Sequence, residues 1–354
     1  MKKLIFSLIV IVLLIGISYL GFSYYIGAEL PSMVSSLLTS HLSVSTFTEP
    51  VDIVIPKGKS LNYVSNLLYE KGVIKNASWF NYQAQLLGVD TKIKPGSYTI
   101  EPTMTFNDIF SLIQRGTPIK PVILSIPEGH TIFQIAAEVE QMGFGTAEEF
   151  IIATEEIFAL KDLSFNTENL YFVMEGYLLP DTYHFTITST PKDIALRMAT
   201  TMSEFLESNY IERMNELDIS THEVLTIASL IEREAYSVDE MTTISGVIHN
   251  RLNINMLLQL CPTVIYGYGK GEEHLSRVLY SHLQYENSFN TYLNLGLPPG
   301  PIAAPGRDAI HAALFPEDHD YLFYALSTDG HAFSKTYAEH LRNVTKLRRL
   351  QGDN

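Results

Sequence analysis

The sequence predicts an α+β protein with a single N-terminal transmembrane helix, a small module and a larger mixed α/β domain. Three observations support this prediction: a long uncharged apolar segment at the start, an internal repeat of strand and helix signals, and a helix-rich C-terminal half. A chain of 354 residues is long enough for two domains with their own cores. We expect five segments, at residues 1–28, 29–48, 49–120, 121–193 and 194–348.

The first segment, residues 1–28, is expected to be a cytoplasmic tip followed by a transmembrane anchor. Residues 4–28 contain no charge, and about 20 apolar residues are enough to cross a bilayer. Lys2 and Lys3 precede the apolar run, so the positive-inside rule leaves the N-terminus in the cytoplasm and the remaining domains outside. The alternative is a cleavable signal peptide, whose apolar part is usually only about 7–15 residues long. We favour a single-pass protein of the cell membrane, with residues 29–48 as a short extracytoplasmic stalk.

The charge and the cysteine and histidine content exclude several classes of function. The formal net charge is −15, which argues against nucleic acid or an anionic lipid surface as partner. Cys261 is the only cysteine, so no intramolecular disulfide can form. The eleven histidines form no zinc motif such as His-Glu-x-x-His. We therefore expect no metal and no cofactor.

The sequence contains an internal repeat, with one copy in the module at residues 49–120 and a second copy in residues 121–193. Residues 55–65 align with residues 126–136, and both read as the end of a strand, a Pro-x-Gly turn, a Ser or Thr cap and an amphipathic helix. Units of strand, two helices and strand resemble LysM modules, which bind polymers of N-acetylglucosamine. The alternative interpretation is that both copies are structural spacers.

The distinctive chemistry begins at residues 220–235, where a helix is predicted. Ser220 and Glu223 have the spacing of a capping box. Glu232 and Glu234 are two residues apart, which is about 200° around the helix axis, so both cannot face the same cleft. Glu232 lies beside apolar surface, where desolvation would raise its pKa as a general acid requires. The pattern alone fits a solvated, salt-bridging helix face as well.

Several ordered blocks with matching spacing resemble the endolytic murein transglycosylase (YceG-like) family. The blocks lie at residues 175–183, 228–234, 249–252, 258–259, 262–264, 290–292, 296–303, 305–306 and 331–334. The resemblance also covers the N-terminal anchor and the LysM-like part. It implies that residues 194–348 form a catalytic domain.

The resemblance implies non-hydrolytic cleavage of the MurNAc–GlcNAc β-1,4 bond within peptidoglycan glycan strands. The family's single catalytic glutamate is expected at Glu232, the first glutamate of the motif, which would protonate the leaving oxygen. Glu232, or a neighbouring base, would then help the muramic C6 hydroxyl to attack C1, which leaves a 1,6-anhydro end. Because the nucleophile belongs to the substrate, one carboxyl group is enough. Penicillin-binding synthases are the partners that the resemblance suggests, with this protein as a terminase of their nascent strands.

Five polar residues inside the matching blocks are candidates for substrate binding: Asn250, Arg251, Gln259, Asn290 and Tyr292. Each could instead brace a loop.

The chain departs from the family at Cys261, where an aspartate usually precedes the proline. This change would remove either a helix N-cap, at a cost of about 1 kcal/mol, or a polar group of the cleft. We favour the cap.

Two other classes of function stay open at this stage. A hydrolase could use Glu232 with Asp181, which requires their carboxyl groups to lie roughly 5–9.5 Å apart across a cleft. A non-catalytic scaffold could bind glycan through the LysM-like units. A solvent-exposed Glu232 outside any groove would favour the scaffold.

Overall fold

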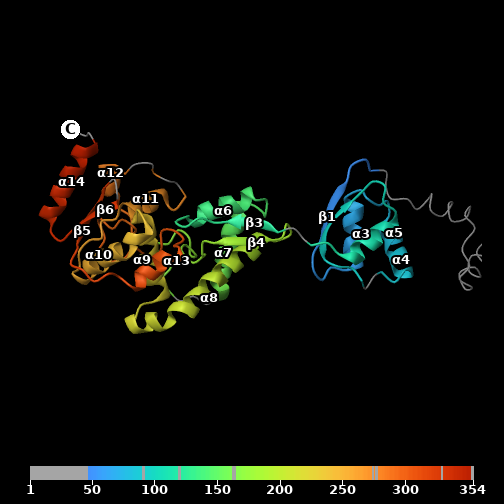
Figure 1. The fold of residues 1–354 in the computed structure, drawn as a ribbon, viewed down its shortest axis with the longest axis horizontal. Helices are drawn as coiled ribbons and strands as arrows, with labels where there is room; N and C mark the ends of the chain where they lie inside the picture. Colours follow the sequence, from blue (N-terminus) through green and yellow to red (C-terminus); the bar gives the residue numbers. More distant parts are fainter. Residues whose placement is uncertain are drawn as a thin grey trace, which may run out of the picture. The chain divides into compact units, whose positions relative to one another are not determined.

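The computed structural model describes residues 47–89, 92–118, 121–161, 165–272, 275, 278–327 and 330–351. The predicted anchor at residues 1–28, and all but the last residues of the predicted stalk, lie outside this part. Among the helices of the described residues, none is both long and apolar enough to span a membrane. The chain divides into two compact units, Met1–Lys120 and Pro121–Asn354, and each is described by itself (Figure 1).

The first unit has the order strand, helix, helix, strand, helix. Its elements are β1 (Val51–Ile55), α3 (Leu61–Glu70), α4 (Ala77–Leu86), β2 (Gly96–Ile100) and α5 (Phe106–Arg115). β1 and β2 pair antiparallel, with Val51 opposite Ile100. Apolar side chains from all five elements form one core, in which Tyr98 and Phe80 are almost fully buried. The first four elements have the predicted order of strand, two helices and strand, whereas the likeness of the module to LysM modules stays a prediction.

The second unit begins with the same five elements in the same order. They are β3 (Val122–Ser125), α6 (Ile132–Gln141), α7 (Ala147–Lys161), β4 (Thr182–Phe185) and α8 (Pro191–Leu217). β3 pairs antiparallel with β4, and Val122 lies opposite Phe185. The sequence alignment continues in the same register to Gly72 and Gly143, and the repeat in the structure extends further, over all five elements.

Two local details agree between the copies. The Tyr98 hydroxyl donates to the Lys94 carbonyl at 2.5 Å, and the Tyr183 hydroxyl donates to the Leu179 carbonyl at 2.6 Å, four residues back in both cases. The helix after each second strand begins with a threonine capping box, in which an aspartate three residues later completes the pair. Such caps contribute about 1 kcal/mol each and depend only on neighbouring residues.

The rest of the second unit surrounds one buried helix, α9. Its elements are α9 (Thr221–Glu234), η1 (Val238–Glu240), α10 (Met241–Asn253), α11 (Cys261–Gly269), α12 (Tyr280–Leu283), α13 (Arg307–Leu314), β5 (Phe323–Ser327), β6 (Gly330–Ser334) and α14 (Tyr337–Gln351). The predicted capping box is present, since the Glu223 N–H donates to the Ser220 hydroxyl at 3.2 Å. α9 packs against α10, α11 and α13 (Figure 1), and every residue from 224 to 231 is buried.

One apolar core runs through the second unit from Leu124 to Leu314. The second copy of the repeat therefore packs together with the helices that follow it. α8 crosses the limit expected between residues 193 and 194. The predicted division of the second unit into residues 121–193 and 194–348 stays a prediction.

Candidate active site

A cavity of about 420 Å³ lies at the C-terminal end of α9. This volume is in the range of ligand sites, about 300–1,000 Å³. Three of the five predicted substrate-binding residues line it, together with Glu234. The lining residues are Glu234, Arg251, Gln259, Cys261, Tyr292, Phe323, Tyr324, Leu326, His331, Tyr337 and His340.

Glu234, the last residue of α9, supplies a carboxyl group to this cavity. Part of the residue stays open to the cavity, yet burial raises the pKa of its carboxyl group to about 7. The Tyr324 hydroxyl and the Arg251 guanidinium oppose this rise, because both favour the charged form. A carboxyl group with a pKa near 7 is populated in both forms at neutral pH. Glu234 can therefore donate a proton and later take one back.

Arg251 fixes the wall of the cavity rather than reaching freely into it. Its buried guanidinium donates from Nε to the Leu322 carbonyl at 2.6 Å and from Nη1 to the Leu258 carbonyl at 2.5 Å. It also lies 5.5 Å from the ring centre of Phe323. Arg251 thus joins α10 to the start of β5, and its positive charge is held close to Glu234.

Gln259 is exposed and has a φ of +50°, in the left-handed region that few non-glycine residues adopt. Its backbone N–H donates to the Thr291 carbonyl at 3.1 Å, which holds the peptide in place. Backbone strain of this kind costs about 1–3 kcal/mol and gathers at ligand sites. Its position at the cavity fits a substrate contact.

The interpretation of Cys261 as a lost helix cap is wrong. Cys261 is the first residue of α11 and its N-cap residue is Leu260, which makes no side-chain cap hydrogen bond. The Cys261 thiol instead lies in the cavity, 3.3 Å from the Tyr292 hydroxyl. Burial raises the pKa of both groups, so both are neutral at pH 7. An aspartate at this position would point a charged group at the site.

Asn250 and Asn290 do not line the cavity and act as loop braces. The Asn250 amide donates to the carbonyls of His319 and Tyr321 at 2.7 and 3.1 Å. The buried Asn290 donates to the carbonyls of Leu283, at the end of α12, and Tyr285, and accepts from the Tyr292 N–H at 3.0 Å. Asn290 therefore positions Tyr292, whereas a direct substrate contact by either asparagine has no support in the geometry.

Glu232 lies on a different side of α9 from the cavity. Its Oε2 accepts from the Gly306 N–H at 3.0 Å. Burial raises its pKa, the Gly306 N–H lowers it, and the charge of Glu128 raises it again. The structure thus confirms that the two glutamates face different surroundings, but it groups the predicted binding residues with Glu234. The role of Glu232 as the acid stays a prediction, and Glu234 is a second candidate for that role.

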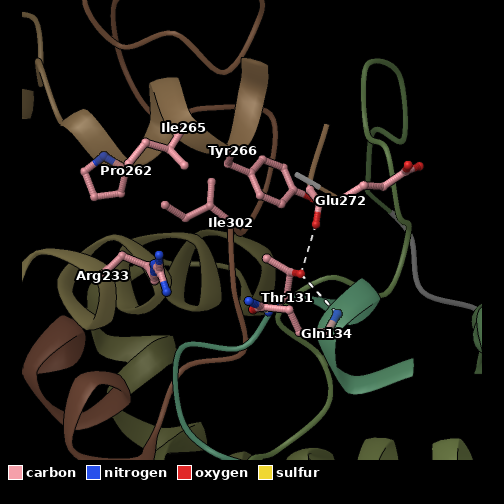
Figure 2. Close-up of a pocket in the computed structure, with 9 residues that line it drawn as sticks. Thr131, Gln134, Arg233, Pro262, Ile265, Tyr266, Glu272 and Ile302 are labelled. Carbon is pink, nitrogen blue, oxygen red and sulfur yellow. Dashed lines mark hydrogen bonds between the residues drawn. The ribbon is translucent and has the colours of Figure 1, made fainter. Parts of the chain in front are cut away.

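Arg233, between the two glutamates, faces a third environment (Figure 2). It lines a pocket of about 30 Å³ between the start of α6, α9 and α11, which has room for about one water molecule. Beside it the Thr131 hydroxyl donates to the Gly271 carbonyl at 2.9 Å and accepts from the Gln134 N–H at 3.3 Å. This pocket is too small for a sugar ring.

Asp181, the second carboxylate considered for a hydrolase, does not line the cavity. Its Oδ2 pairs with Arg307 Nη2 at 2.9 Å, and its side chain is half-exposed. An exposed ion pair of this kind contributes little to stability. The structure shows Asp181 engaged by Arg307 at the end of the loop before β4.

Sequence reasoning missed the wall that β5, β6 and α14 supply. Tyr324, His331 and His340 line the cavity from these three elements. The block at 331–334 was a signal for His331, because it belongs to the pattern that the family shares. No comparable local pattern marked Tyr324 or His340.

The comparisons with known proteins agree with one another. The YceG-like family model matches residues 53–346. An endolytic murein transglycosylase of Bacillus subtilis (strain 168) is 33% identical, over 82% of this chain and 82% of its own length. One from Streptococcus pneumoniae serotype 2 is 28% identical over 98% of this chain, which spans only 65% of that longer protein.

Among solved structures, a crystal structure of a yceG-like protein from Listeria monocytogenes is similar to this fold. The TM-score is 0.58 and the sequence identity 32%, over 84% of this chain and 100% of that one. Family model, relative and fold lead to one conclusion: this chain belongs to the YceG-like family.

Proposed function

We propose that this protein is an endolytic lytic transglycosylase, which cleaves MurNAc–GlcNAc β-1,4 bonds within peptidoglycan glycan strands with Glu234 as the acid. The names of the relatives support the substrate and the reaction class. The observation that carries the proposal is the composition of the cavity. Glu234 is the one carboxylate among the described residues that line it, and its pKa is about 7.

The presence of a single carboxyl group at the cavity distinguishes a lytic transglycosylase from a hydrolase. Hydrolases need a second carboxylate to act as nucleophile or to activate water. In the proposed reaction Glu234 transfers its proton to the glycosidic oxygen while the bond from that oxygen to C1 breaks. The muramic C6 oxygen forms the new bond to C1, and the C6 hydroxyl proton passes to a base. Both products together contain the atoms of the substrate, so no water is consumed.

The aromatic wall of the cavity suits a saccharide. Phe323 and Tyr337 line it with ring centres 5.8 Å apart, and Tyr337 is 60% exposed. With a net charge of −15, the protein has no bulk attraction for an anionic polymer, so recognition depends on stacking and hydrogen bonds. Tyr292 and Gln259 are the polar groups that we assign to substrate contact, and Arg251 braces the wall through the carbonyls of Leu258 and Leu322.

The cellular setting is part of the same proposal. We place residues 1–28 in the cell membrane as a single-pass anchor, with the catalytic unit on the outer side, on the evidence of the uncharged apolar segment. An anchored endolytic enzyme would act on strands as they leave the membrane-bound synthases. Release of nascent strands is the role we propose for it, with the penicillin-binding synthases as partners.

The test uses the full-length chain in detergent, with purified glycan strands and mass spectrometry of the products. The matched variants are Glu234→Gln and Glu232→Gln, which remove one ionisable carboxyl group each from the last turn of the same helix. We expect 1,6-anhydro ends from the wild type, a loss of at least about 100-fold in Glu234→Gln, and a change below about 10-fold in Glu232→Gln.

Other outcomes separate the rival functions. The reverse ranking of the two variants would return the acid to Glu232. Reducing ends in place of anhydro ends would indicate a hydrolase. Strand binding without cleavage by the wild type would support the scaffold.

A further inference from the structure

His331 and Glu240 form a buried pair at the edge of the cavity that the proposed reaction has not used. His331 Nδ1 lies 2.7 Å from Glu240 Oε1, and the His331 backbone N–H donates to Glu240 Oε2 at 3.0 Å. Their side chains are only 4% and 12% exposed. Gly330, before His331, has a φ of +115°, and a Cβ there would lie 3.1 Å from Glu240 Oε2. A side chain at position 330 would therefore crowd this carboxylate.

Glu240 is held as an anion. Burial alone would raise its pKa, but hydrogen bonds from the His331 N–H, the Tyr236 N–H and the His331 ring outweigh burial and lower it. A carboxylate has only acceptor sites, so the Nδ1 of His331 carries the hydrogen of this contact. In the neutral imidazole Nε2 then has the free lone pair. Within the described part of the chain, no hydrogen bond engages Nε2.

Tyr324 connects this pair to Glu234. The Tyr324 ring packs edge-on against the His331 ring, with 5.0 Å between centres. Its buried hydroxyl makes no hydrogen bond among the described residues, yet lies near enough to Glu234 to favour the charged form. Glu240 from η1 contacts the imidazole, and the other charged and titratable groups that line the same cavity are Glu234, Arg251, Cys261, Tyr292, Tyr324, Tyr337 and His340.

We propose that His331 is the general base of the reaction and that Glu240 is its positioning residue. This inference depends on the proposed transglycosylase function and deepens it. His331 Nε2 takes the proton of the muramic C6 hydroxyl while the C6 oxygen bonds to C1. Glu234 gives its proton to the leaving oxygen in the same displacement. The imidazolium then returns its proton to the Glu234 carboxylate, directly or through solvent, and both groups regain their starting forms.

A purely structural role is the alternative, because the pair also ties η1 to β6. Chemical rescue distinguishes the two roles, since added imidazole can replace a missing base but cannot restore a lost tie. The experiment measures kcat and KM on glycan strands for the full-length chain in detergent, for His331→Ala and His331→Gln, with and without imidazole. His184→Gln changes an exposed histidine of β4 outside the cavity and is the matched control.

We expect both His331 variants to lose about 100-fold or more in kcat with little change in KM. Imidazole should restore turnover to His331→Ala and leave Glu234→Gln inactive. If His331→Ala does not fold, the value of kcat for His331→Gln, which conserves the size of the side chain, tests the role of His331.

Activity of His331→Gln within about 3-fold of wild type would overturn the inference. Loss of activity without imidazole rescue in folded His331→Ala would also overturn the base role. A wild type that forms no anhydro ends would instead contradict the proposed function itself.

Discussion

Glu175 offers a sharp test of how the second copy of the repeat is joined to the catalytic helices. Its carboxyl group is buried, at 3% exposure. It accepts from the N–H of Ile132, the first residue of α6, at 3.0 Å and from the Tyr266 hydroxyl of α11 at 3.2 Å. Burial raises its pKa from 4.5 to about 8 in spite of these hydrogen bonds. The substitution Glu175→Gln keeps the size and removes the ionisation.

The sign of the effect follows from the raised pKa. The folded protein prefers the neutral acid, so the stabilisation is complete below pH 4.5 and is lost as pH rises through about 8. Each pH unit in this window costs about 1.4 kcal/mol. The wild type therefore loses on the order of 3 kcal/mol from this group between pH 4.5 and 7, an upper limit. A glutamine side chain does not ionise, so the variant does not lose this stabilisation as pH rises. Glu175→Gln should therefore be the more stable protein at pH 7 and above.

Urea unfolding at pH 5, 7 and 9 measures this difference, with two probes. Trp79, in α4, is the only tryptophan, so its fluorescence reports on the first unit alone. Far-UV circular dichroism follows both units. We expect the variant to shift only the transition of the second unit, and to shift it more at pH 9 than at pH 5. An equal effect at all three pH values would refute the reasoning, because Glu175 would then be ionised in the folded state.

Two further predictions concern the surroundings of the glutamates. If Glu234 is the acid, kcat/KM should decline as pH rises through about 7. The Tyr324 hydroxyl lowers the pKa of Glu234, so Tyr324→Phe should move this decline to higher pH. An unmoved pH profile would contradict the assignment of Glu234 as the acid. A Cβ at Gly306 would collide with the Glu128 carboxyl group, so Gly306→Ala should destabilise the fold by about 1–3 kcal/mol in thermal unfolding. Because Gly306 does not line the cavity, folded Gly306→Ala should keep its activity, and a large loss would indicate that the Glu232 side of α9 is the active one.

Local signals in the sequence were sufficient for the helix starts and for the repeat. The capping box of Ser220 and Glu223 is present as predicted, because a cap depends on residues three positions apart. The aligned strand and helix signals mark both copies for the same reason. The family could also be predicted, because the order and spacing of the residue blocks can be recognised in the sequence without knowing which contacts the residues make.

The site could be predicted only in part. Arg251, Gln259 and Tyr292 were named from the family blocks, and the structure brings them together around one cavity. Asn250 and Asn290 were named by the same route and are braces. A block pattern shows that a residue is retained in the family but does not show whether it touches the substrate.

The sequence by itself determined the family, the helix that carries the motif, and the fact that Glu232 and Glu234 face different ways. Only the tertiary structure decided which of the two faces the cavity. Residues 224–231 of α9 are buried on every side, so the helix has no polar face from which the position of a cleft could be inferred. The cavity lies beside the last turn of α9 and is lined by α10, α11, β5 and β6, of which β5 and β6 lie far along the chain from α9.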